Sequence, residues 1–219
     1  MQSSKITLTF DNGPEPKVTH AVLDCLSHHD VAASFFVMGR KAVAPAGAAL
    51  VRRASECGHR IGNHTFSPAT PLGELDRAAA LADFEKAENA LAWLKQPHRY
   101  FRPYGRAGKL GHHLLHPSVV EKLQTGGYTC VLWNSVPGDW RDPDGWVDRA
   151  IADCRTRPWS LVVLHDTPTG AMAHLDEFLH RVKEEGMEIS QDYPPECTPI
   201  VDGRLAGPIE PYVAEDAAA

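Results

Sequence analysis

The chain has 219 residues, 43% of them apolar, and its formal net charge at pH 7 is −6. This length suits one domain with a sizeable core. The negative charge and the scattered Lys and Arg residues argue against nucleic acid or an anionic membrane surface as a partner. No apolar run approaches the ~18 residues of a membrane span, and the N-terminus lacks a basic stretch followed by an apolar one. The five cysteines form no CxxC pair. We therefore expect a cytoplasmic protein with reduced, mostly buried thiols.

Short apolar runs alternate along the chain with longer amphipathic stretches. The run KITLTF at 5–10 predicts a strand, and residues 19–30 carry apolar side chains at helical spacing. The same alternation predicts strands at 31–39, 59–66, 100–105, 128–134 and 159–166, and helices at 45–57, 72–95, within 111–127, at 142–155 and at 173–186. This order predicts an α/β protein with a mainly parallel sheet or barrel. We expect one domain over residues 1–219, with an irregular, proline-rich tail from about residue 192.

Polar residues recur where the expected strands end. They are Asp11, Asn12, His64, Arg102 and His165, with Asp139 and Trp140 shortly after the fifth strand. In parallel α/β folds the carboxyl ends of the strands meet at one edge, where catalytic groups gather. A single Asp or His at a strand end is usually a turn former or a hydrogen-bonded structural residue. Several in one chain need a common reason, so we expect them to form one site.

Five short motifs, in order, resemble those of a known family. They are TFDNGP (9–14), NHTFSP (63–68), FRPYG (101–105), WNSVPGDW (133–140) and VLHD (163–166). With these motifs the chain resembles the polysaccharide deacetylase family (NodB homology, carbohydrate esterase family 4-like), whose members are amide hydrolases. The resemblance covers residues 6 to about 185. It implies a distorted (β/α) barrel with fewer than eight complete units.

The resemblance also implies roles for individual side chains. Asp11 matches the catalytic base of the family, and Arg102 matches the residue that positions and tunes this base. His165 matches the general acid, with Asp139 as its partner. The backbone at Tyr104 matches the segment that helps to hold the oxyanion.

The chain departs from the family at the metal site. The family holds a divalent metal with a second Asp and two His residues, and the matching positions here are Asn12, His64 and Pro68. Catalytic zinc usually has three protein ligands. We therefore predict a site with no metal or other cofactor, in which Asn12 and His64 contact the substrate. A turn-forming role for Asn12 and a divalent metal such as zinc at His64 remain the alternatives.

Other histidines give weaker signals. His112 and His116 in GHHLLHP would share one face of a helix, a spacing compatible with metal binding, but the flanking Gly and Pro favour a loop. We interpret the remaining helical histidines as surface residues, namely His28, His29, His174 and His180.

Amide hydrolysis requires an activated water, a stabilised oxyanion and protonation of the leaving nitrogen. Asp11 can take a proton from water while Arg102 balances its charge, and His165 can protonate the nitrogen. Without a metal the scissile bond must be reactive. We therefore predict a hydrolase that cleaves a non-peptide C–N bond in a small amide, cyclic imide or ureide.

The expected partner is thus a small amide, imide or N-acetylated molecule. Trp140, Tyr104 and Phe66 are expected to wall its pocket. Two alternatives remain open: a metal-dependent deacetylase of polysaccharides or N-acetyl sugars, and a non-catalytic carbohydrate-binding homologue. Related small hydrolases often pair through their barrel faces, which allows a homo-oligomer.

Overall fold

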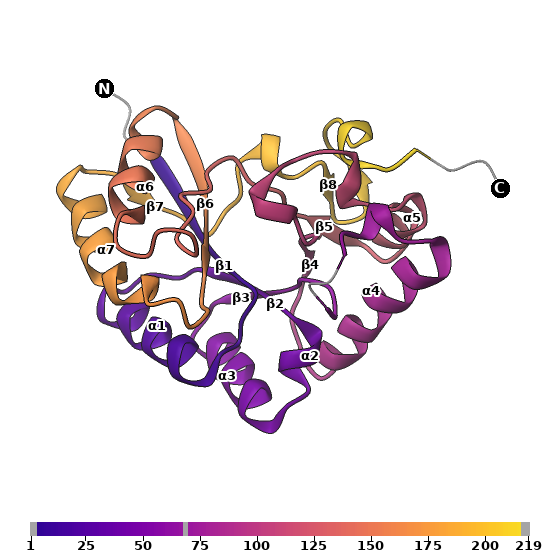
Figure 1. Ribbon diagram of the computed structural model, residues 1–219, viewed down its shortest axis with the longest axis horizontal. Helices are drawn as coiled ribbons and strands as arrows, with labels where there is room; N and C mark the ends of the chain where they lie inside the picture. Colours follow the sequence, from indigo (N-terminus) through magenta and orange to yellow (C-terminus); the bar gives the residue numbers. More distant parts are fainter. Residues whose placement is uncertain (1–3, 68–69, 216–219) are drawn as a thin grey trace.

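The computed structural model describes residues 4–67 and 70–215, which form one curved sheet with helices packed around its outer side (Figure 1). In these residues the sheet has nine strands, in the order β6-β1-β2-β3-β4-β5-β8-β9, with β7 beside β1. Their bounds are β1 (Lys5–Asp11), β2 (Ser34–Val37), β3 (Arg60–Asn63), β4 (Arg99–Phe101), β5 (Tyr128–Cys130), β6 (Trp159–His165), β7 (Glu188–Ile189), β8 (Ile200–Val201) and β9 (Arg204–Leu205). Pairing from β6 through β5 is parallel, and β8 and β9 add antiparallel pairs. The predicted distorted (β/α) barrel is confirmed.

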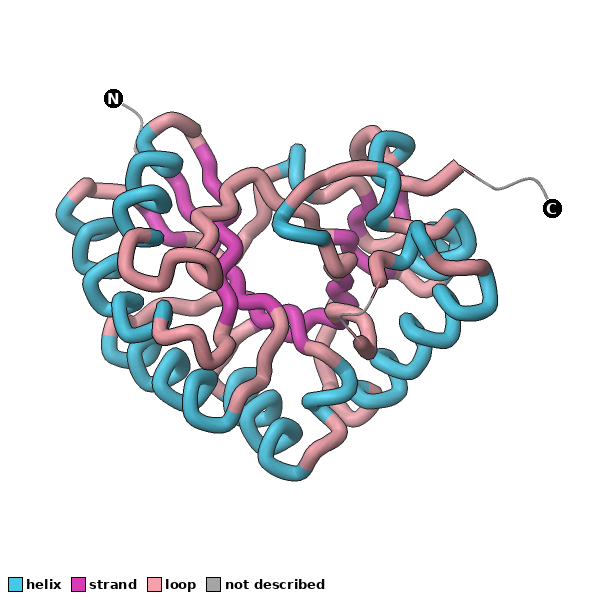
Figure 2. Tube along the Cα trace, viewed as in Figure 1, coloured by secondary structure: helices cyan, strands magenta, loops and turns pink. Residues whose placement is uncertain are grey.

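Figure 2 shows the strands curving around an interior, with the helices on the outside. The helices are α1 (Pro16–His28), α2 (Gly39–Ala42), α3 (Pro45–Glu56), α4 (Arg77–Leu91), α5 (Pro117–Thr125), α6 (Trp146–Arg155) and α7 (Leu175–Glu184). Pro is the first residue of α1, α3 and α5, where its missing N–H has no helical partner to lose. In the described chain no helix is both long and apolar enough to cross a membrane.

The alternation of side chains along β1 separates the core from the site. Ile6, Leu8 and Phe10 pack in one hydrophobic cluster with residues of α1, α3, α6 and α7. The intervening residues, Thr9 and Asp11 among them, point to the other face of the strand, because successive side chains alternate in a strand. Arg102 bonds to both. The apolar face therefore holds the helices, and the polar face turns toward the barrel interior.

The register aligns the ends of the parallel strands. Asp11 pairs with His165 of β6 on one side and with Phe36 of β2 on the other. Asn63 at the end of β3 pairs with Phe101 of β4. His64 and Arg102 follow these two residues directly, so the polar residues emerge from one edge of the sheet.

Several predicted boundaries are wrong, and hydrogen bonds give the reasons. The predicted helix at 72–95 begins late, at α4, because Asp76 caps it by accepting the N–H of Ala79. The predicted strand at 128–134 ends at Cys130. The next two carbonyls, of Val131 and Leu132, accept hydrogen bonds from the Arg102 side chain instead of continuing the ladder.

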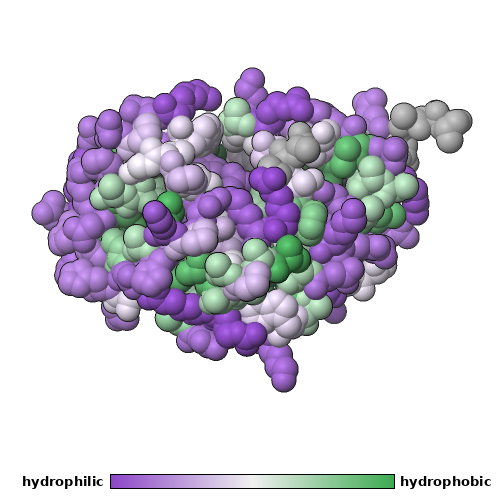
Figure 3. All heavy atoms as spheres, turned by 60° about the horizontal axis from the view of Figure 1, so that its bottom comes forward, coloured by the Kyte–Doolittle hydropathy of each residue, from purple (hydrophilic) through white to green (hydrophobic). Residues whose placement is uncertain are grey.

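The tail from residue 192 is less irregular than predicted. It contains β8 and β9, and Cys197 and Ile200 are buried. The five cysteines are free, and three of them are buried, while the reduced state of the thiols stays a prediction. One outer face is largely hydrophilic with small separate hydrophobic patches (Figure 3).

Candidate active site

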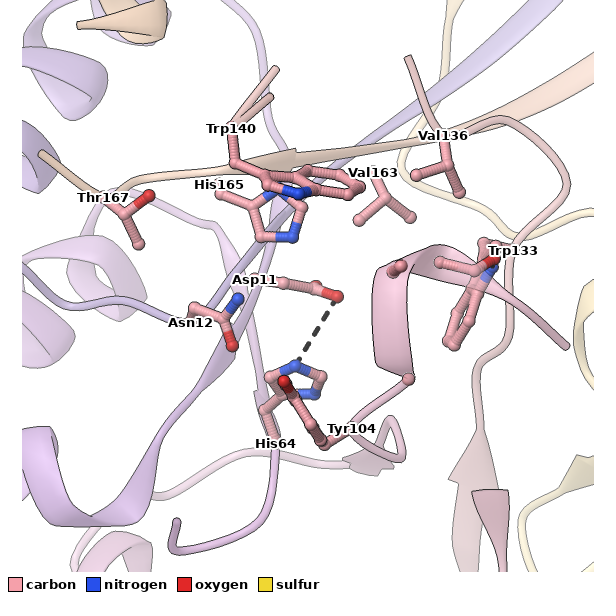
Figure 4. Close-up of a pocket in the computed structure, with 13 residues that line it drawn as sticks. Asp11, Asn12, His64, Tyr104, Trp133, Val136, Trp140, Val163, His165 and Thr167 are labelled. Carbon is pink, nitrogen blue, oxygen red and sulfur yellow. Dashed lines mark hydrogen bonds and ion pairs between the residues drawn. The ribbon is translucent and has the colours of Figure 1, made fainter. Parts of the chain in front are cut away.

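A cavity of about 300 Å³ opens at the edge where the parallel strands end. Figure 4 shows polar side chains from several strand ends pointing into it. Its lining comprises Asp11, Asn12, His64, Tyr104, Gly105, Ala107, Gly108, Trp133, Val136, Trp140, Val163, His165 and Thr167. Six of the predicted site residues thus meet in one place. Arg102 and Asp139, both fully buried, lie behind the lining and bond to it.

Asp11 and Arg102 form a buried ion pair beneath the cavity. Arg102 Nη1 lies 2.8 Å from Asp11 Oδ1 and also donates to Thr9 Oγ1. The guanidinium Nε and Nη2 donate to the carbonyls of Val131 and Leu132 at 3.0 and 3.1 Å. These bonds fix the guanidinium, so its charge balances the carboxylate while Asp11 Oδ2 is left for other partners.

The hydrogen bond of His64 fixes its tautomer. His64 Nδ1 lies 2.9 Å from the Arg102 carbonyl oxygen. Because a carbonyl can only accept, Nδ1 carries the proton and donates it. Burial lowers the pKa of the ring, and although the charge of Asp11 opposes this shift, the net direction is down. The ring is therefore neutral, and Nε2 presents a lone pair 3.7 Å from Asp11 Oδ2. Two acceptors thus face each other, and both need a donor from water or substrate.

Asp139 holds His165 from two sides. Its Oδ1 lies 2.9 Å from the ring Nδ1, and its Oδ2 accepts the backbone N–H of His165 at 2.9 Å. Burial on its own would lower the pKa of His165, but the hydrogen bond and charge of Asp139, with the charges of Asp11 and Asp166, raise it above its ordinary value. Trp140 stands edge-on to the imidazole, with ring centroids 4.7 Å apart. The surroundings thus favour the cationic form of the ring, which a proton donor requires.

The turn after β1 rests on a second buried carboxyl. Asn12 has a φ of 71°, a left-handed conformation that Asn tolerates. A Cβ on Gly13 would lie 2.1 Å from Asp166 Oδ2, so only Gly fits there. Asp166 accepts the Thr19 hydroxyl through Oδ2, while burial raises its pKa to about 7. This packing directs the Asn12 carboxamide into the cavity, where its Oδ1 is buried and has no partner among the described residues.

The walls are aromatic. Tyr104 and Trp140 line the cavity as predicted, and the Tyr104 ring lies 6.2 Å from that of His64. Trp133, which sequence reasoning did not select, forms a further wall and is held by a bond from Nε1 to the Gly108 carbonyl at 2.8 Å. Its place at the head of the WNSVPGDW motif was the available signal.

The structure places Phe66 outside this cavity. Its ring lies beside Gly39 and 6.0 Å from the Lys86 ammonium, between α2 and α4. The sequence predicted a strand over residues 59–66, which would be long enough to bring Phe66 to the cavity. β3 instead ends at Asn63, and Thr65 takes a φ of 66°. The chain therefore turns away before it reaches Phe66.

The donor groups do not fit a catalytic divalent metal. The cavity offers one imidazole lone pair, one neutral carboxamide oxygen and the carboxylate of Asp11, whose charge Arg102 already balances. A buried dication would therefore lack a compensating anion. Over residues 4–67 and 70–215 the sole compact group of three His, Cys, Asp or Glu side chains lies elsewhere. Pro68 falls outside the described residues, and the absence of a metal stays a prediction.

In the fold and the site, a (β/α) barrel brings a carboxylate and an imidazole to one cavity, an arrangement that hydrolases with acid–base catalysis use. Comparison with known proteins agrees. The polysaccharide deacetylase family model matches residues 1–115. A chitooligosaccharide deacetylase of Sinorhizobium fredii is 33% identical over 177 residues, which cover 78% of this chain and 76% of the relative. A peptidoglycan-N-acetylglucosamine deacetylase of Bacillus cereus is 30% identical over 196 residues, with 83% of each chain covered.

The chain belongs to the polysaccharide deacetylase family. Its fold also matches the crystal structure of the Bc1960 peptidoglycan N-acetylglucosamine deacetylase, with a TM-score of 0.74 and 23% identity over 92% of this chain and 91% of the other. The predicted family and the predicted class, a hydrolase acting on non-peptide carbon–nitrogen bonds, are confirmed.

Proposed function

We propose that this protein hydrolyses the amide bond of a small N-acetylated substrate, with Asp11 as general base and His165 as general acid. The observation that carries the proposal is the pairing of these two residues. They are register partners on adjacent parallel strands, and both open into the same cavity. A base and an acid side by side can act on the two sides of one scissile bond.

The acceptors of Asp11 and His64 can orient the attacking water. Asp11 Oδ2 and His64 Nε2 lie 3.7 Å apart and both lack a proton, so one water can donate a hydrogen to each. Its lone pair then faces the cavity. In the chemical step Asp11 takes a proton from this water while the oxygen attacks the carbonyl carbon. The metal-site histidine of the family thus has a role here without a metal.

The oxyanion needs donors at the cavity wall. The backbone N–H of Tyr104 makes no hydrogen bond to another described residue, and the Asn12 carboxamide supplies an N–H₂ group. One such donor contributes about 3 kcal/mol to transition-state stabilisation. His165 then gives its Nε2 proton to the leaving nitrogen as the C–N bond breaks, because Nδ1 is bonded to Asp139. An acid and an amine result.

The cavity favours a small substrate or the end unit of a longer one. Its volume of about 300 Å³ lies at the lower end of the ~300–1,000 Å³ typical of ligand pockets. Aromatic side chains form its walls, which suits a ring with an apolar face. The names of the relatives point to an N-acetylated sugar as substrate. Because Asn12 and His64 are neutral and do not favour a metal, a more reactive cyclic imide or ureide is also a candidate substrate.

Acetate and amine release would test the proposal. The purified protein is assayed with N-acetylglucosamine oligomers, N-acetylated small amines and a cyclic ureide, with and without EDTA. We expect chelator-resistant turnover that falls about 10²–10⁴-fold in Asp11→Asn and in His165→Gln, with the remote, exposed Cys57→Ser as matched control. Turnover abolished by EDTA and restored by zinc would instead identify a metal-dependent deacetylase. Sugar binding without turnover, unchanged in Asp11→Asn, would identify a carbohydrate-binding homologue.

A further inference from the structure

Three potential metal ligands, Cys25, His29 and Asp176, meet on the outer surface away from the cavity, and His180 lies beside them. Cys25 and His29 lie one turn apart at the end of α1, and the N–H of His29 still bonds to the Cys25 carbonyl. Asp176 and His180 lie one turn apart on α7. The ligand atoms of Cys25, His29 and Asp176 are all within 4.8 Å of one another. Figure 1 shows α1 and α7 side by side, so two i, i+4 pairs face each other across one helix contact.

The hydrogen bonds within this cluster prepare its nitrogen atoms. His180 Nδ1 lies 2.9 Å from the Asp176 carbonyl oxygen and 3.3 Å from Asp176 Oδ2, so Nδ1 carries the proton and faces Asp176, while Nε2 keeps its lone pair. A bond of this kind orients most metal-ligating histidines. His29 Nε2 lies 2.8 Å from Asp176 Oδ1, and its ring centroid is 4.8 Å from that of His180. The two imidazoles therefore flank a single carboxylate.

We propose that Cys25, His29 and Asp176 form a second site, which binds a zinc-class divalent cation, and that a rotation of the neighbouring His180 side chain supplies the fourth donor. One thiolate, two imidazoles and one carboxylate make a four-donor set of the type that tetrahedral zinc accepts. On such an ion the nitrogen and oxygen ligands lie about 3.4 Å apart. The cation would thus replace the proton between His29 and Asp176, with small side-chain rotations. The His29 side chain is only 11% exposed, so the site is partly sheltered from water.

The position of the site suggests what a bound cation does. α1 follows β1, which ends in Asp11, and α7 follows β6, which ends in His165. A cation shared by the two helices would brace the two strand–helix units that carry the proposed acid–base pair. Binding to the folded chain alone raises stability by mass action. We therefore expect a Tm increase of about 5–10 °C when free zinc exceeds its Kd ~100-fold.

Cobalt(II) titration tests the site directly, because thiolate ligation gives a charge-transfer band and tetrahedral geometry gives intense d–d bands. We expect one equivalent of Co²⁺ to produce both in the wild type. Cys25→Ser should remove the charge-transfer band, and Asp176→Asn and His180→Ala should each weaken binding at least tenfold. Far-UV circular dichroism checks that each variant is folded.

Two controls separate this site from other thiols and from the cavity. Cys57→Ser removes the exposed thiol, and His64→Ala removes the imidazole of the cavity; both should keep the charge-transfer band. The absence of the band in the wild type, or its survival in folded Cys25→Ser, would overturn the proposal. Its loss in His64→Ala would do the same.

Discussion

Asp139 binds His165 with both of its carboxylate oxygens, one at the ring Nδ1 and one at the backbone N–H, each at 2.9 Å. Side chain and main chain are therefore locked together, and the imidazole has one orientation toward the cavity. Asp139 is fully buried, and it supports the raised pKa of its partner.

Asp139→Asn should impair proton donation without removing the imidazole. The lost charge lowers the pKa of His165, so the alkaline limb of the pH–rate profile should move to lower pH, with kcat reduced about 10²-fold or more. The profile is measured on the best substrate of the panel. An unchanged alkaline limb would mean that His165 is not the acid.

Removing one partner of the buried ion pair should be costly. Arg102→Met leaves the Asp11 carboxylate buried without its counter-charge, so we expect a loss of about 3–5 kcal/mol in the free energy of unfolding. The double variant Asp11→Asn/Arg102→Met should lose less than the sum of the two single variants. Urea denaturation of the wild type, the two single variants and the double variant gives the four free energies of this double-mutant cycle. Strict additivity would contradict the coupling.

Asp166 should make stability depend on pH. Its pKa is raised to about 7 by burial, opposed by the Thr19 hydrogen bond, from an ordinary value of about 3.8. The folded state therefore holds a proton that the unfolded state releases between these values. The contribution of this proton to the free energy of unfolding is fully present below pH ~4. It is lost, by as much as ~4 kcal/mol, as pH rises through 7.

The raised pKa of His165 acts in the same direction. Asp166→Asn should consequently stabilise the protein at pH 8 and leave it little changed at pH 4, as measured by denaturant unfolding. Thr19→Ala is a useful companion variant, because it removes the hydroxyl donor while leaving the buried carboxyl in place. An identical slope of stability against pH in the wild type and Asp166→Asn would refute this assignment.

Asn12→Asp should change the electrostatics of the cavity. The second carboxylate would lie next to Asp11 and His64, giving a dication the anion that the present donor set lacks. In a Cys25→Ser background, which removes the proposed surface site, we expect zinc to raise the Tm of Asn12→Asp and to leave the parent unchanged. Equal zinc responses in both proteins would show that Asn12 does not set the preference of the cavity for metals.

The sequence was sufficient to predict which strands end in catalytic candidates, and most of the residues of the site. Asp11 and His165 sit at the ends of runs whose apolar character identifies them as buried strands, and parallel strands bring their ends together. Asp139 was also found, because it belongs to a motif, although it lies in a loop. The cytoplasmic location and the homo-oligomer stay predictions.

What sequence could not predict depends on long-range geometry. Phe66 follows His64 by two residues, but the left-handed φ of Thr65 turns it away. The sequence predicts His29 and His180 only as surface residues of helices, because the periodicity of one helix does not reveal which other helix it faces. Their proximity appears only when α1 and α7 are packed, 151 residues apart in sequence.

The C-terminal segment is connected to the buried Arg102 beneath the cavity by two successive hydrogen bonds through the Leu132 backbone. The Cys197 carbonyl accepts the N–H of Leu132 at 2.7 Å, and the Leu132 carbonyl accepts Nη2 of Arg102 at 3.1 Å. Truncating the protein before Cys197 would therefore remove the hydrogen bond that holds the Leu132 backbone, and the Arg102 guanidinium would be less well fixed. Residues nearly two hundred positions downstream of Asp11 thus help to position the arginine with which Asp11 pairs.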